Sequence, residues 1–114
     1  MNGQLTLGEN IADNGGIREA FRAYEIYVQR NGEELRLPGL DEFSPYQLFF
    51  LSFAMSWCEA KSPEAIVNQI YFNPHSPGRY RILGPLTNDK NFARIWNCPP
   101  ETEMNRGDDR CLLW

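Results

Sequence analysis

Residues 9 to 30, ENIADNGGIREAFRAYEIYVQR, decide the fold that the sequence predicts. Apolar and aromatic side chains recur in this stretch at steps of three and four residues, which is the spacing of one face of an α-helix. We therefore predict a long amphipathic helix from Glu9 to Arg30, and Asn31-Gly32 directly after it is a typical helix stop. The residues that carry the pattern are Ile17, Ala20, Phe21, Tyr24 and Val28.

Two carboxylates open this helix one turn apart, and two glycines follow them. Glu9 and Asp13 share a helix face, where like charges repel by roughly a few tenths of a kcal/mol. An acidic first turn that interacts with the helix dipole is the simplest interpretation of this pair. Gly15 and Gly16 each cost about 1 kcal/mol relative to alanine inside a helix, so we expect another element to lie close to them. If another element lies close to the two glycines, both carboxylates point toward it.

Two further helices are predicted from their start signals. Ser44-Pro45-Tyr46-Gln47 combines a capping serine, a proline at the first helical position and a glutamine that can close a capping box. The helix behind it, from Pro45 to Trp57, is apolar on nearly every face, so we expect it to be central. Ser62-Pro63-Glu64 starts a third helix that reaches Tyr71. Helical spacing predicts that six aromatic residues form core: Phe21, Tyr24, Phe49, Phe50, Phe53 and Trp57.

The last third of the chain is predicted to be less regular. Residues 79–83 are expected to be extended, because they lie between Pro77-Gly78 and Gly84-Pro85. Thr87-Asn88-Asp89 can cap a last short helix that ends near Trp96, and residues 98–114 are expected to be irregular. The predicted fold class is mostly α, in one domain of 114 residues with a single short extended segment.

Composition excludes several kinds of partner. Eleven basic and fifteen acidic residues give a net charge of −4, and no cluster of lysine and arginine offers a surface for nucleic acid. No stretch approaches the roughly 20 apolar residues that a membrane span needs, and residues 1–4 do not resemble a signal peptide. We therefore predict no nucleic-acid partner, no membrane span and no targeting signal within this chain.

The cysteines and the single histidine carry weak signals when each is taken alone. Cys58, Cys98 and Cys111 are odd in number and match no zinc-binding spacing, so at least one is free or paired outside the chain. Spacing alone also permits a Cys98–Cys111 loop, with Cys58 buried and free. His75 is by default a surface residue or a hydrogen-bonded core residue, although Asn73-Pro74 and Ser76-Pro77 place it on a rigid loop.

Three ordered motifs resemble one protein family along the whole chain. Residues 2–16, NGQLTLGENIADNGG, closely resemble the zinc-ligand helix of the neprilysin and endothelin-converting-enzyme family of metalloendopeptidases. The resemblance continues through residues 73–81, NPHSPGRYR, and Phe92, and it ends in Cys111-Leu112-Leu113-Trp114, a Cys-x-x-Trp terminus. It implies that residues 1–114 are the C-terminal helical part of a thermolysin-like (zincin) catalytic domain.

The resemblance also implies roles for the two carboxylates. Glu9 matches the third zinc ligand, which joins two histidines of an upstream His-Glu-x-x-His helix in a site that holds one Zn²⁺. Asp13 matches an acid that accepts the far ring N–H of a zinc-bound histidine and so fixes its orientation. The one-turn spacing would then place one carboxylate on the metal and the other on a ligand of the metal.

Two residues of the second motif would act on the substrate. His75 matches a histidine that donates to the oxyanion of the tetrahedral intermediate. Arg81 matches an arginine whose planar guanidinium holds a peptide carbonyl beside the scissile bond. Cys58, Cys98 and Cys111 match cysteines that form disulfides, each with a partner upstream of this chain.

The sequence contains no His-Glu-x-x-His, so two zinc ligands and the general-base glutamate are absent. We therefore expect an incomplete domain whose upstream half lies outside the chain, from a secreted protein or the ectodomain of a single-pass membrane protein. We consider two hypotheses for the function. In the first, the chain is part of a zinc-dependent endopeptidase that hydrolyses oligopeptides by metal-activated water, and the chain alone is inactive. The other is a non-catalytic helical module that binds a partner, such as the missing part of a related peptidase.

Overall fold

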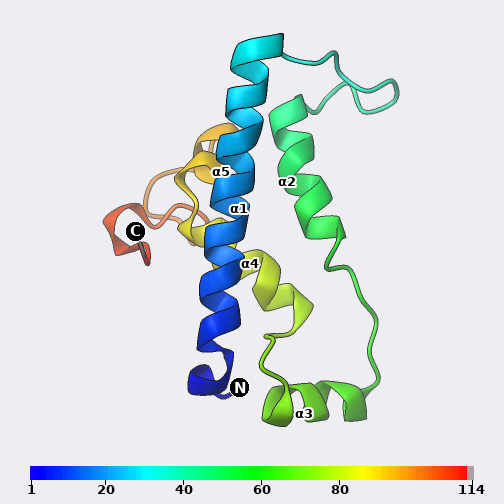
Figure 1. Ribbon diagram of the computed structural model, residues 1–114, viewed down its shortest axis with the longest axis vertical. Helices are drawn as coiled ribbons and strands as arrows, with labels where there is room; N and C mark the ends of the chain where they lie inside the picture. Colours follow the sequence, from blue (N-terminus) through cyan, green and yellow to red (C-terminus); the bar gives the residue numbers. More distant parts are fainter. Residues whose placement is uncertain (113–114) are drawn as a thin grey trace.

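The computed structural model describes residues 1–112, which fold into five α-helices, four of which pack around one small core. The helices are α1 (Gly3–Asn31), α2 (Pro45–Met55), α3 (Pro63–Phe72), α4 (Gly78–Asn88) and α5 (Lys90–Ile95), and a short 3-10 helix spans Gly107–Asp109. Helix α1 runs along the length of the molecule, with α2 beside its later half and α4 packed against it (Figure 1). Helix α3 lies apart at one end. The prediction of a mostly α fold is confirmed.

Helix α1 begins earlier than the sequence pattern predicts. The side chain of Asn2 caps it, because Oδ1 accepts from the backbone N–H groups of Gln4 and Leu5 at 3.1 and 3.3 Å. The predicted start at Glu9 is therefore wrong by about two turns, while the predicted stop is confirmed. Gly32 has a φ of +85°, which glycine adopts without strain, and its N–H donates to the carbonyl of Val28 at 2.8 Å.

The start signals of α2 and α3 are confirmed in atomic detail. Ser44 Oγ accepts from the backbone N–H of Gln47 at 3.2 Å, and Gln47 Oε1 accepts from the backbone N–H of Ser44 at 2.8 Å. Ser62 Oγ accepts from the N–H of Ala65 at 3.3 Å at the start of α3. Each of these helices is therefore started by contacts within four residues, which explains why the sequence predicts them correctly.

The core lies where α1, α2 and α4 meet. Phe21 and Phe50 are fully buried, and their rings stack with centroids 5.1 Å apart. Ile17 and Leu86 complete the buried cluster, and further side chains of α2, α4 and α5 pack on it. Helix α2 is less central than predicted, since Phe50 is its one buried residue while Met55 is 70% exposed.

Residues 79–83 form part of α4, so the predicted extended segment is wrong. The N–H groups of Tyr80 and Arg81 both donate to the carbonyl of Pro77, which closes the first helical turn. Pro85 lies inside the helix, where a missing N–H and the proline ring cost about 3 kcal/mol. The helix passes through it because Pro85, Leu86 and Thr87 are all buried against the rest of the fold. Burial has overridden the local turn signal.

The end of the described chain follows the prediction more closely. Asp89 caps α5, and its Oδ1 accepts from the N–H groups of Asn91 and Phe92 at 2.6 and 3.1 Å. Between residues 98 and 112 the chain is irregular apart from the 3-10 turn and an isolated bridge between Thr102 and Asn105. Within residues 1–112, no helix is long and apolar enough to cross a membrane.

Candidate active site

The four residues that the motifs single out lie together in the structure. Glu9 and Asp13 are on the first half of α1, His75 is on the loop between α3 and α4, and Arg81 is on the first turns of α4. Because α1 packs on α4, the chain brings these side chains together across more than sixty positions of sequence. They pair as Glu9 with His75 and Asp13 with Arg81.

The first pair joins α1 to the histidine loop. Nε2 of His75 lies 3.1 Å from Oε2 of Glu9, and both side chains are a little under half exposed. Asn73, the residue after α3, holds the other side of the imidazole. Its Oδ1 accepts from the backbone N–H of His75 at 2.8 Å and lies 3.1 Å from the ring Nδ1. Both ring nitrogens therefore face an oxygen acceptor.

The second pair joins α1 to α4 and is better shielded. Nε and Nη2 of Arg81 donate to the two oxygens of Asp13 at 2.7 and 2.6 Å, a bidentate geometry that only arginine offers. The side chains of Arg81 and Asp13 are 15% and 10% exposed. The hydrogen bond to Asp13 raises the pKa of Arg81 above its ordinary value. Arg81 also lies over the ring of Trp57, with Cζ 3.8 Å from the centroid.

The start of α4 is held close to the chain that follows α2. A Cβ on Gly78 would lie 2.6 Å from the carbonyl oxygen of Trp57, so only glycine fits there. The N–H of Gly78 donates to Oε1 of Glu59 at 3.1 Å. The pKa of Glu59 is lowered by its hydrogen bond with Lys61 first and by this backbone N–H second. These contacts fix the position of the helix that carries Arg81.

Three residues of this region were missed or misread in the sequence. Asn73 was read only as part of a rigid loop, although an asparagine two residues before a histidine can accept from both its backbone and its ring. Glu59 carries no signal in the sequence, because its contact with Gly78 depends on tertiary structure. Trp57 was predicted to be core, whereas it is half-buried beneath Arg81. The core prediction is confirmed for Phe21 and Phe50.

Metal-binding groups are incomplete in this chain. Glu9 offers one carboxylate, but among the described residues no group of three or more His, Cys, Asp or Glu side chains can hold a metal ion. Cys58, Cys98 and Cys111 are free thiols, so the Cys98–Cys111 loop is not formed. Cys58 is exposed, which contradicts the expectation that it is buried in that alternative. Disulfides with cysteines outside the chain stay a prediction, and Leu113 and Trp114 of the terminal motif lie outside the described residues.

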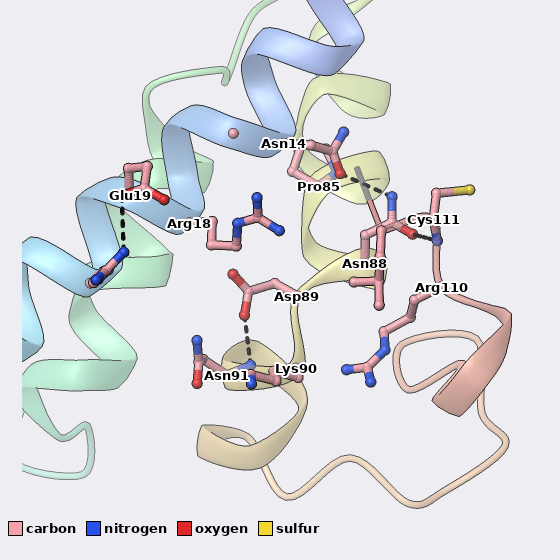
Figure 2. Close-up of a pocket in the computed structure, with 13 residues that line it drawn as sticks. Asn14, Arg18, Glu19, Pro85, Asn88, Asp89, Lys90, Asn91, Arg110 and Cys111 are labelled. Atoms are coloured by element: carbon pink, nitrogen blue, oxygen red, sulfur yellow. Dashed lines mark hydrogen bonds and ion pairs between the residues drawn. The ribbon is translucent and has the colours of Figure 1, made fainter. Parts of the chain in front are cut away.

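Two pockets adjoin α1, and the second of them includes Asp13 in its lining. A pocket of about 540 Å³ lies between the middle of α1 and the α4–α5 junction, away from the four predicted residues. Figure 2 shows its polar lining, in which Asn88 bonds to Asn14 and to the backbone of Cys111. A second, mainly apolar pocket of about 620 Å³ lies between α1 and α2 and is lined on α1 by Asp13 and Gly16 among others.

The glycine pair predicts a close neighbour, but the space beside Gly16 is open. A Cβ added there would meet nothing within 4 Å, so no described element presses on this glycine. The small residues Ala12, Gly16 and Ala20, spaced one turn apart, form an exposed stripe along the pocket between α1 and α2. At Gly16 the predicted close approach is therefore not made by residues 1–112.

Comparison with known proteins decides the family. A sequence model described as Peptidase family M13 matches residues 1–112. The chain belongs to peptidase family M13. The M13 chain is 52% identical to neprilysin of Mus musculus and 46% identical to endothelin-converting enzyme 1 of Bos taurus, in both cases over all of its 114 residues. This family assignment confirms the resemblance drawn from the three motifs.

A solved structure supports the fold of this M13 chain. It is titled "Haemonchus galactose containing glycoprotein complex", and it matches 96% of the chain with a TM-score of 0.89 and 37% identity. The M13 chain covers 18% of that structure's chain and 15% of the length of each of the two enzymes named above.

Proposed function

We propose that this chain is one part of the catalytic domain of a zinc-dependent metalloendopeptidase and supplies one zinc ligand and the substrate-contacting side of the site. Membership in family M13 supports the reaction class. The single observation that carries the proposal is the pairing of Glu9 with His75 and of Asp13 with Arg81 in one place. The remaining ligands, two histidines, would come from protein outside these 114 residues.

Glu9 would hold Zn²⁺ through the carboxylate that contacts His75 in this chain. The residues present fit one ligand of a two-histidine, one-glutamate site and not a whole site. Zinc, when bound, supplies an activated water and polarises the scissile carbonyl. Asp13 would accept an N–H from one of the two ligand histidines, because a carboxylate that already binds one guanidinium still has free lone pairs.

His75 would donate a hydrogen bond to the negative oxygen that develops on the scissile carbonyl. Its Nε2 lies 3.1 Å from Glu9, so it sits beside the ligand that holds the metal. Because Asn73 Oδ1 already accepts from the His75 backbone, the same oxygen faces Nδ1 as an acceptor. The ring would then donate to the substrate from Nε2.

Arg81 would hold the substrate backbone next to this position. Its Nε and Nη2 are committed to Asp13, while Nη1 makes no hydrogen bond with the described residues. Nη1 can therefore donate to a peptide carbonyl without breaking the pair with Asp13. The substrate class that fits these donors is an oligopeptide bound in extended form.

We further propose that the complete protein works outside the cell, as a secreted enzyme or as an ectodomain. The three free thiols would then pair with cysteines elsewhere in the complete protein.

A chimera tests the proposed function. The aligned 114 residues of mouse neprilysin are replaced by this chain, and cleavage of an internally quenched peptide is measured with and without a zinc chelator. Chelator-sensitive cleavage by the chimera, and none by the isolated chain, is the expected result. A folded chimera that binds zinc but leaves the peptide intact would instead favour the non-catalytic binding module.

A further inference from the structure

The loop that carries His75 is short and is held at several points. Residues 73–77 join α3 to α4, and the side-chain amide of Gln69 donates to the carbonyls of His75 and Ser76 at 3.4 and 3.3 Å. These bonds tie the loop to α3. They do not position it relative to α1, which carries Glu9.

One partly buried hydrogen bond makes that connection. Ser76 is 2% exposed, and its hydroxyl donates to Oδ1 of Asn10 at 2.7 Å. Asn10 follows Glu9, and Ser76 follows His75. The bond therefore joins the direct neighbours of the two residues that face each other in the site.

The amide of Asn10 is oriented from its other end. Its Nδ2 donates to Oγ1 of Thr6 at 3.2 Å, and Thr6 is itself buried and donates to the carbonyl of Asn2 at 3.3 Å. Thr6 thus fixes which end of the amide faces Ser76. A hydrogen-bond network that is anchored on the buried side chains of Thr6 and Ser76 favours one fixed geometry.

The Glu9–His75 contact would hold the loop less firmly in the complete enzyme, because a metal bound to the Glu9 carboxylate would reduce the negative charge that attracts the imidazole. Among the described residues, the Asn10–Ser76 bond is then the remaining direct hydrogen bond between α1 and residues 73–77.

We propose that Asn10 and Ser76 are positioning residues, which hold the His75 loop against the Glu9 turn of α1 so that His75 stays at the scissile carbonyl. The inference rests on the proposed function. It assigns a role to two residues that neither touch the substrate nor bind the metal.

The test uses the active chimera and separates positioning from simple stability. Ser76→Ala is expected to lower kcat about 10- to 100-fold, because a displacement of about 1 Å at a catalytic group costs that much. KM and bound zinc should stay unchanged. Asn10→Ala should lower kcat by a similar factor. The double variant should lose no more kcat than the less active of the two single variants, because both substitutions remove the same bond. Ser56→Ala is the matched control, since its hydroxyl bonds only to the carbonyl of Phe53 within the end of α2.

The decisive comparison is made in a His75→Ala background. If Ser76 acts through His75, adding Ser76→Ala there should change kcat less than twofold. A further loss comparable to that in the unmodified chimera would mean a general structural role and would overturn the inference. So would full kcat in Ser76→Ala and Asn10→Ala alone. An inactive parent chimera would contradict the proposed function itself, and the positioning role with it.

Discussion

Asp13 and Arg81 form the most enclosed charged pair in the described chain, and each has a second task in the proposed mechanism. Removing either partner leaves the other charge partly buried without compensation, which is costly. Substitutions at this pair therefore combine a structural effect with a functional one. Glu9 and His75 are more exposed, so their substitution reports on function more directly.

Glu9→Gln in the chimera should abolish most zinc binding, because a neutral amide replaces an anionic ligand. Asp13→Ala should keep the metal and lower activity by about 10- to 100-fold through a misplaced ligand histidine. Metal content by atomic absorption and peptide cleavage measure the two effects. Glu19→Gln, an exposed glutamate on the same helix, is the control. Normal zinc content in Glu9→Gln would remove Glu9 from the ligand set.

His75→Ala should lower kcat by about 10²- to 10³-fold with little change in KM, which is the usual cost of one lost oxyanion donor. Arg81→Ala should mainly raise KM, because Arg81 is proposed to hold the substrate backbone. Steady-state kinetics separate the two effects. Arg79→Ala changes an exposed arginine nearby and should behave as the parent. Unchanged turnover in His75→Ala would exclude the oxyanion role.

At the scale of elements, sequence predicts what is local and fails where packing decides. The box of Ser44 and Gln47 lies within four residues and was predicted correctly. Residues 79–83 were misread, because the burial of Pro85 and Leu86 that keeps α4 helical is not visible locally. The candidate site shows the same division. Motifs predict roles for Glu9 and Arg81, which stay predictions, whereas the contact of Glu59 with Gly78 required the tertiary structure.

Two glycines of α4 should respond in opposite ways to alanine. Gly78→Ala places a Cβ 2.6 Å from a backbone oxygen and should destabilise the fold by about 1–3 kcal/mol. Gly84→Ala meets nothing within 4 Å and should be neutral or stabilise by up to about 1 kcal/mol. Denaturant unfolding of the two variants in the chimera measures the difference. Equal stability would mean that the Gly78 contact relaxes at no cost.

At the scale of the whole molecule, much apolar surface is exposed. Tyr71 and Phe72 on α3 are mostly exposed, and the stripe from Ala12 to Ala20 is open along α1. The structure holds one small cluster of buried side chains. Sequence predicts these helices, but no residue among 1–112 covers their exposed apolar faces.

Gly16→Ala distinguishes the isolated chain from the complete domain. In the isolated chain the new methyl group meets nothing within 4 Å, so helix content should rise slightly. In the chimera an element packed on the stripe would be displaced, and both stability and cleavage should fall. Circular dichroism measures helix content in the isolated chain and thermal stability in the chimera, and the peptide assay measures cleavage by the chimera. If the variant is as active and stable as the parent chimera, no other backbone lies close to Gly16.

The isolated chain should bind zinc weakly and cleave no peptide, because its described residues contain no set of three ligands. Its exposed apolar faces should also make it self-associate. Calorimetric titration with zinc under reducing conditions, followed by the quenched-peptide assay and light scattering, tests each point. Tight stoichiometric binding would show that the described groups rearrange into a metal site.

Helix α1 is uninterrupted from Gly3 to Asn31, and it carries Glu9 in its first half and the buried Phe21 in its second. The two positions are separated by about 18 Å along the helix axis, at about 1.5 Å per residue. A tilt of about 3° at Phe21 therefore moves Glu9 by about 1 Å, a distance that matters to catalysis. Core substitutions around Phe21 should therefore change the activity of the proposed peptidase, and laboratory evolution for activity should recover such substitutions far from any substrate atom.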